Sequence, residues 1–210
     1  MKTDDLIEAL AAGLEPVKPA RLSPLMVGGA FAVAVLVVVF LLGVLPDLAE
    51  LVRGPVFWAK AAYTGALAVA SAWLVARLGR PGARIGMAGW SVAAVVGVAA
   101  ALGVIELARL PAEARMDAWL GFTWRICALN ILMISAFTAP LIFLAARRLA
   151  PTRPIQAGAA AGLLTGAVAA TAYGLHCPEA TAAFVATWYT LGMAAAAAIG
   201  AGIGRFALRW

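Results

Sequence analysis

The stretch that decides the fold is residues 25–45, which read LMVGGAFAVAVLVVVFLLGVL. This run has 21 residues and no charged side chain. Because a bilayer core of about 30 Å needs about 20 apolar residues in a helix, the run is long enough to cross a membrane. A secretory signal peptide would have an apolar run of about 7–15 residues followed by a small-residue cleavage site, and neither is found here. We therefore interpret residues 25–45 as a retained transmembrane helix.

Five further runs along the chain are similarly long and apolar. Hydrophobic residues make up 64% of the 210 residues and charged residues 12%, whereas soluble domains have about 25% charged residues. Strands of a membrane β-barrel would alternate apolar and polar residues over about 10 positions, and no such alternation is present. Lys60 lies near the start of one run, where its long side chain is expected to reach the lipid headgroups. We predict an all-α, polytopic membrane protein with six transmembrane helices, the other five at residues 56–76, 85–105, 126–146, 154–175 and 180–204.

Basic residues are divided unevenly between the two ends of the predicted helices. Of the 16 Lys and Arg residues, 11 fall on the side of the two chain ends and the second and fourth loops, and 5 fall on the other side. Loops rich in Lys and Arg stay in the cytoplasm. We therefore expect a multi-pass protein of a bacterial inner membrane with its N-terminus and C-terminus in the cytoplasm.

The chain outside the predicted helices is short. Its longest pieces are residues 1–24 and 106–125, and independent domains of fewer than about 40 residues usually need disulfides or metals to fold. We divide the chain into a cytoplasmic segment, residues 1–24, and a transmembrane bundle, residues 25–210, and expect no enzyme. No Asp, Glu, Lys or Arg lies in the middle of a predicted helix, which disfavours ion-coupled transport. A small passive transporter or channel stays an alternative, as does a structural subunit of a membrane complex.

Small residues recur at intervals of four in the last two predicted helices. Such stripes let the backbones of two membrane helices approach closely. Packing of these two helices within the bundle is favoured over a dimer interface. The residues concerned are Gly158, Gly162 and Gly166, followed by Gly200 and Gly204.

The two cysteines, Cys127 and Cys177, are 50 residues apart, yet both lie at predicted outer ends of helices. In a bacterium that side faces the oxidising periplasm. Three interpretations are open: two separate packing residues, a structural disulfide, or a pair that responds to redox or metal chemistry. His176, next to Cys177, is a candidate accessory because it could lower a thiol pKa or join the sulfurs around a soft metal. A zinc site would need four ligands, and Glu179 could supply the fourth.

Residues 3–15 predict a short amphipathic helix ahead of the first transmembrane helix. Thr3 or Asp4 suits the N-cap, and acidic side chains suit the positive end of a helix. Acids on this helix would be repelled by an anionic leaflet, so a partner's groove fits the apolar stripe better than a membrane surface does. A tail without a partner is the other interpretation. The contact residues we expect are Asp4, Asp5, Leu6, Ile7, Glu8, Leu10 and Leu14.

Several short motifs follow one another in an order that is typical of one family. They are MKTDDLI at 1–7, a cysteine in the fourth predicted helix, PTRP at 151–154, HCP at 176–178, WY at 188–189 and LRW at 208–210. In these features the chain resembles the NrsF-type membrane proteins, which are negative regulators of extracytoplasmic-function (ECF) sigma factors. The likeness covers almost the whole chain.

The resemblance implies an anti-sigma factor that takes part in transcription regulation and stress response. Its partner would be a cytoplasmic ECF sigma factor, with no direct contact to nucleic acid. Residues 1–15 would hold the sigma factor, and Cys127 and Cys177 would respond to heavy-metal or redox stress. No constitutive cofactor is implied, only transient heavy-metal binding at the two thiols. Glu179 is followed by Ala180 where the family often has a second acid, which speaks against paired carboxylates as metal ligands.

Overall fold

The computed structural model describes residues 3–12 and 21–209. All regular elements in the described residues are helices, ten of them α-helical and two π-helical. In chain order they are α1 Thr3–Ala11, α2 Pro24–Val37, η1 Val38–Leu42, α3 Leu48–Leu51, α4 Pro55–Leu78, α5 Gly86–Arg109, α6 Ala112–Leu120, α7 Trp124–Arg147, α8 Pro154–Tyr173, α9 Ala182–Phe184, η2 Val185–Tyr189 and α10 Thr190–Ala207.

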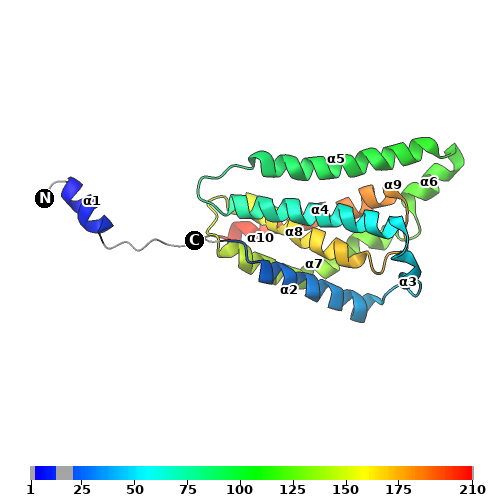
Figure 1. Ribbon diagram of the computed structural model, residues 1–210, viewed down its shortest axis with the longest axis horizontal. Helices are drawn as coiled ribbons and strands as arrows, with labels where there is room; N and C mark the ends of the chain where they lie inside the picture. Colours follow the sequence, from blue (N-terminus) through cyan, green and yellow to red (C-terminus); the bar gives the residue numbers. More distant parts are fainter. Residues whose placement is uncertain (1–2, 13–20, 210) are drawn as a thin grey trace.

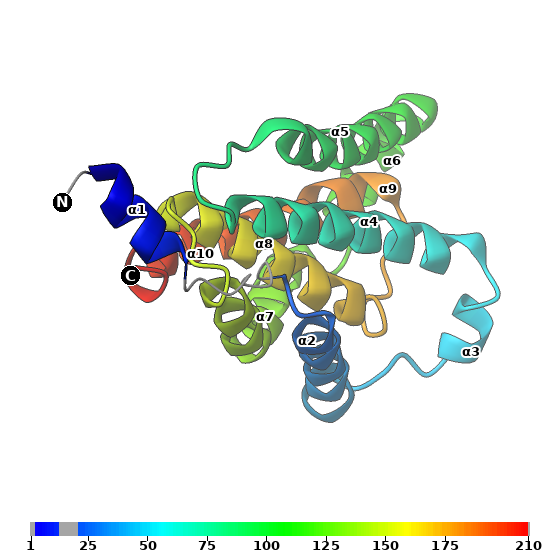
Figure 2. The same cartoon turned by 60° about the vertical axis from the view of Figure 1, so that its left-hand side comes forward.

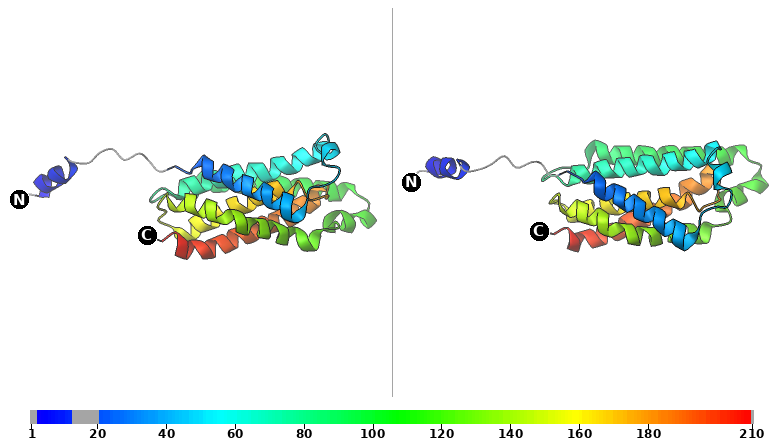
Figure 3. Two further views of the ribbon diagram at one scale, coloured as in Figure 1. Left: turned by 90° about the horizontal axis from the view of Figure 1, so that it is seen from below. Right: turned by 60° about the horizontal axis from the view of Figure 1, so that its bottom comes forward.

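Six segments of the described chain are long and apolar enough to cross a membrane: Pro24–Leu42, Pro55–Leu78, Gly86–Arg109, Ala112–Arg147, Pro154–Tyr173 and Ala182–Ala207. This confirms the all-α fold and the six predicted helices. The start of α2 and the end of α10 lie at the same end of the bundle, as six crossings require (Figure 3). Which compartment that end faces stays a prediction from the basic loops.

Helix starts follow local sequence. Pro24, Pro55 and Pro154 each occupy the first position of their helix, where a missing backbone N–H costs nothing because that N–H would have no partner within the helix. Ser23 caps α2, since its side chain accepts a hydrogen bond from the Met26 N–H at 3.4 Å. After η1 the chain turns at Gly43, whose φ of 79° favours glycine.

The centre of the bundle is α8, which packs against α10, α4, α7 and α2 (Figure 2). Most of its side chains are buried, and many of them are alanine or glycine. Because these side chains are small, four neighbouring helices can approach α8 closely.

Helices α8 and α10 meet along the two glycine stripes. A Cβ atom added to Gly158 would lie 2.6 Å from the Gly204 Cα, and one added to Gly200 would lie 2.7 Å from the Gly162 Cα. A Cβ added to Gly166 would lie 3.0 Å from the Met193 Cα. The stripes therefore face each other within one chain.

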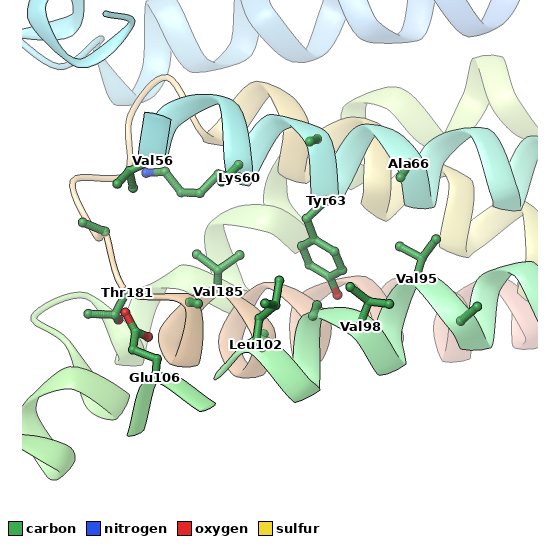
Figure 4. Close-up of a pocket in the computed structure, with 17 residues that line it drawn as sticks. Val56, Lys60, Tyr63, Ala66, Val95, Val98, Leu102, Glu106, Thr181 and Val185 are labelled. Atoms are coloured by element: carbon green, nitrogen blue, oxygen red, sulfur yellow. The ribbon is translucent and has the colours of Figure 1, made fainter. Parts of the chain in front are cut away.

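Helix α5 packs more loosely, and only Ala88 and Gly103 are buried on it. A cavity of about 670 Å³ with mostly apolar walls lies between α4, α5 and the α9–η2 segment. Figure 4 shows Tyr63 pointing from α4 toward α5 in this cavity, with Lys60 near one end. The Tyr63 hydroxyl lies 2.5 Å from the Thr190 Oγ1, which ties α4 to α10 across it.

The end of the bundle opposite the start of α2 is formed by α3, α6, α9 and their turns, and we call it the distal end (Figure 1). The sequence predicts a loop at residues 106–125, but α6 lies within that range. Its Trp119 Nε1 donates to the Thr187 Oγ1 at 3.1 Å, and the Trp188 Nε1 donates to the Trp119 carbonyl at 3.0 Å. These bonds attach α6 to η2, so tertiary contacts hold a helix that hydropathy alone does not reveal.

Candidate functional site

The structure brings Cys127 and Cys177 together at the distal end. Cys127 lies in the first turns of α7, where its backbone N–H donates to the Thr123 carbonyl at 2.9 Å. Cys177 lies in the turn that follows α8. Both side chains are completely buried, neither forms a disulfide, and the two thiols are close enough to share a hydrogen bond. We call these two residues the thiol pair.

Lys60 holds the turn that carries Cys177. Its Nζ donates to the Cys177 carbonyl at 2.9 Å and to the Glu179 carbonyl at 2.8 Å. The expectation that Lys60 reaches the lipid headgroups is therefore wrong, because its side chain is buried and points into the protein. A buried ammonium is stable only where strong acceptors replace water, and two carbonyls of one turn do so here. The signal in the sequence was a lone cation in an apolar run, which often marks a functional position.

Glu179 caps the start of α7. Its Oε1 accepts hydrogen bonds from the Phe122 N–H at 2.7 Å, the Thr123 N–H at 2.9 Å and the Thr123 hydroxyl at 3.0 Å. The carboxylate thus satisfies backbone donors and sits at the positive end of the helix dipole. This contact links the Cys177 turn to the helix that carries Cys127.

The four-ligand zinc site considered from the sequence is wrong. No group of three or more His, Cys, Asp or Glu side chains in the described residues could hold a metal ion. Glu179 is occupied with the start of α7. The His176 Nδ1 lies 3.0 Å from the Gly43 carbonyl oxygen, so this ring joins η1 to the turn and is not a third ligand beside the two sulfurs.

Two buried tyrosines line the thiol pair: Tyr173, which no sequence motif indicated, and Tyr189, which belongs to the WY motif at 188–189. The rings of Tyr173 and Tyr189 have their centroids 5.6 Å apart. Asn130 Nδ2 donates to the Tyr173 hydroxyl at 3.4 Å, whereas the Tyr189 hydroxyl is buried without a hydrogen-bond partner in the described chain. Tyr189 ends the π-helix η2, an element common at functional sites that shifts the direction of the side chains after it.

The two thiols have different surroundings, and this shows in the acidity of Cys177. A hydrogen bond with Cys127 is the largest influence. Together with the approach of the Tyr189 hydroxyl, the Glu179 N–H and the Lys60 charge, it lowers the pKa of Cys177 to about 6, although burial opposes the shift. A lowered pKa favours the thiolate, the form that binds metals and attacks electrophiles.

Helix α1 presents an exposed apolar surface. Leu6, Ile7 and Leu10 are 42%, 60% and 67% exposed, so the bundle does not cover them. The acidic residues expected to contact a partner are exposed on the same helix, namely Asp4, Asp5 and Glu8. Leu14, the remaining expected contact, lies outside the described residues.

Comparison with known proteins identifies the family. The family model described as "Negative regulator of sigma F", NrsF, matches residues 10–210. The chain belongs to the NrsF family. It is 45% identical to the "Anti-sigma-F factor NrsF" of Caulobacter vibrioides and 42% identical to the "Probable anti-sigma-F factor NrsF" of Azospira oryzae, and each alignment covers both chains completely. No solved structure matches the chain.

Membership in the NrsF family confirms the resemblance noted in the motifs. The family consists of regulators, so the chain is a regulatory protein and not an enzyme, as predicted. The NrsF match extends across the whole bundle and reaches into α1, and it therefore includes both members of the thiol pair.

Proposed function

We propose that this protein is an inner-membrane anti-sigma factor that sequesters an ECF sigma factor through its N-terminal cytoplasmic segment. It releases the sigma factor when the thiol pair, facing the periplasm, senses heavy-metal or redox stress. The observation that carries the proposal is the thiol pair itself. Two cysteines 50 residues apart in the chain meet in a buried site, with a cation and two tyrosines around them.

Helix α1 supports a binding role for the N-terminal segment. An apolar ridge of Leu6, Ile7 and Leu10, flanked by acids, fits a partner that offers an apolar groove with basic residues beside it. The curated relatives are named as anti-sigma-F factors, which identifies the partner class as a sigma factor. A sigma factor held in this way at the membrane would be kept from RNA polymerase.

A structural route connects the thiol pair to this segment. Cys127 begins α7 and Cys177 follows α8, so a bond or a metal ion joining the two sulfurs would change how these helices pack. Both helices contact α2, and α2 directly follows the N-terminal segment. A small change at the distal end can thus reach the other end of the bundle as a shift between packed helices.

The chemistry of the pair is strong enough for such a switch. Moving an equilibrium from mostly bound to mostly free needs about 5 kcal/mol of differential stability. Binding of a soft metal ion by the two thiolates is a reaction of that order or larger, and so is their oxidation to a disulfide by an external oxidant that takes up the two electrons.

The binding role is tested with Leu10→Asp in the full-length protein. Fully burying a leucine contributes about 1.5–3 kcal/mol, and a buried unpaired carboxylate adds a further cost. We expect the dissociation constant for the sigma factor to rise at least tenfold, since each tenfold corresponds to about 1.4 kcal/mol. Microscale thermophoresis on the detergent-solubilised protein measures this value.

Ala12→Asp is the matched control. It adds the same charge at an exposed position about 200° around the helix from Leu10, at 100° per residue. We expect it to leave the dissociation constant within about twofold. Equal weakening by the two variants, or none by Leu10→Asp, would contradict binding through the apolar ridge.

A further inference from the structure

The thiol pair is asymmetric. We propose that Cys177 is the thiol that reacts first with a soft electrophile or metal ion, and that Lys60 is the positioning residue that makes it so. Cys127 then acts second. This inference rests on the sensing role proposed above and assigns an order to the two cysteines within it.

A cation and several donors surround Cys177. Lys60 binds the carbonyl of Cys177 and that of Glu179, which places its ammonium beneath the turn. The Glu179 backbone N–H and the Cys127 thiol both approach the Cys177 sulfur. Positive charge and aligned donors are the features that stabilise a thiolate.

The Tyr189 hydroxyl has no strong hydrogen-bond acceptor while the Cys177 thiol is neutral. This hydroxyl is fully buried and has no hydrogen-bond partner in the described chain, yet Cys177 is the sulfur that it approaches. A buried hydroxyl without an acceptor destabilises the folded protein. A thiolate at Cys177 would accept this hydrogen bond, so the hydroxyl favours the charged form of that sulfur.

Cys127 has the opposite surroundings. It lies near the start of α7, where the helix dipole would ordinarily favour a thiolate. The Glu179 carboxylate binds the Phe122 and Thr123 N–H groups there and offsets the positive end of the dipole. The cation is therefore on the Cys177 side of the pair and the anion is on the Cys127 side.

The other titratable groups nearby do not reverse this asymmetry. The Tyr173 hydroxyl, which accepts a hydrogen bond from Asn130, approaches Cys127 much as Tyr189 approaches Cys177, so the asymmetry depends on Lys60 and Glu179. The His176 ring bonds with the Gly43 carbonyl oxygen through Nδ1.

Partial alkylation of the reduced, full-length protein in lipid nanodiscs tests the order. With substoichiometric iodoacetamide, the Cys177 thiolate sulfur bonds to the methylene carbon, the carbon–iodine bond breaks, and iodide leaves. Mass spectrometry of the digested protein then gives the ratio of labelled Cys177 to labelled Cys127. Both thiols are buried in one site, so any opening of the bundle affects both.

The expected preference follows from these surroundings. The cation and donors around Cys177 favour a thiolate there, whereas the Glu179 carboxylate at the start of α7 opposes one at Cys127. We expect Cys177 to be labelled severalfold more than Cys127.

Substitutions on α4 then test Lys60. Lys60→Met should bring the ratio toward one, whereas Lys60→Arg keeps the cation and should preserve the preference. Tyr63→Phe is the matched control on the same helix, because Tyr63 contacts Thr190 and not the thiol pair. Equal labelling of the two cysteines in the unchanged protein overturns the order, and an unchanged ratio in Lys60→Met overturns the role of Lys60.

The outcome is separable from that of the proposed function. Labelling needs no sigma factor, so a preference for Cys177 in a protein that never releases its partner would support this inference and contradict the sensing role. Metal-induced release of the sigma factor, together with equal labelling of Cys127 and Cys177, would support the sensing role and contradict this inference.

Discussion

The substitution Gly162→Ala tests a close contact between the backbones of α8 and α10. A Cβ at this position of α8 would lie 3.0 Å from the Ala196 carbonyl carbon and 3.0 Å from the Ala197 Cα on α10, and it would overlap the Ala196 oxygen. These are backbone atoms, so the added methyl group cannot be accommodated by a side-chain rotation. The two helices would have to move apart.

The expected magnitude combines two opposing effects. Overpacking a tight contact costs about 1–3 kcal/mol, and replacing a helical glycine with alanine returns up to about 1 kcal/mol. We therefore expect Gly162→Ala to lower the free energy of unfolding by about 0.5–2 kcal/mol. Unfolding of the purified protein in mixed micelles, followed by circular dichroism as the SDS fraction rises, measures this quantity.

Gly202→Ala is the matched control, because Gly202 is also helical but has no atom within 4 Å of its added Cβ. This control should be neutral or more stable by up to about 1 kcal/mol. If the two variants have the same stability, the reasoning from the α8–α10 contact is refuted. If Gly162→Ala instead dissociates a dimer without destabilising the monomer, the glycine stripes serve an interface between chains.

Three further predictions concern the distal end. Glu179→Ala leaves the Phe122 and Thr123 N–H groups without their acceptor and should destabilise the protein by about 1–3 kcal/mol in the same unfolding assay, with Glu179→Gln closer to the unchanged protein. Because the pKa of Cys177 is about 6 when folded and an unfolded thiol titrates near about 8.5, stability should increase from pH 6 to about pH 8.5 and be lost as pH falls toward 6. Cys177→Ser should lack that increase, and a parallel pH dependence of its melting temperature would contradict the assignment. In a cysteine-free background, Phe122→Cys should react rapidly with an impermeant maleimide in intact spheroplasts, because Phe122 is 98% exposed. Labelling only after lysis would show that the distal end faces the cytoplasm.

The six membrane-spanning helices could be predicted from the sequence because burial in lipid demands long apolar runs, whatever packs against them. The placement of Cys127 and Cys177 at the same end follows from the same reasoning, since each lies at the end of a run. That the two sulfurs meet could not be predicted, because hydropathy gives the depth of a residue but not the direction in which it points around its helix.

Other features of the site depend on contacts between distant segments. Hydropathy suggested that Lys60 reaches the lipid headgroups. Its acceptors are the carbonyls of Cys177 and Glu179, more than a hundred positions later in the chain, and the local sequence gives no sign of them. The π-helix that ends at Tyr189 leaves no signal in hydropathy, and α6 is held by tryptophan hydrogen bonds to η2. The glycine stripes were recognisable because their spacing of four is itself a packing pattern.

The most direct test of the account measures sigma-factor binding as the state of the thiol pair is changed. The full-length protein in nanodiscs is titrated with its fluorescently labelled sigma factor, first reduced and then with Cd²⁺ added, and the same is done with Cys127→Ser/Cys177→Ser. The account predicts that Cd²⁺ raises the dissociation constant at least tenfold in the unchanged protein and leaves that of the double variant unchanged. Release of equal size in both proteins, or in neither, would contradict a thiol pair that controls the sigma factor.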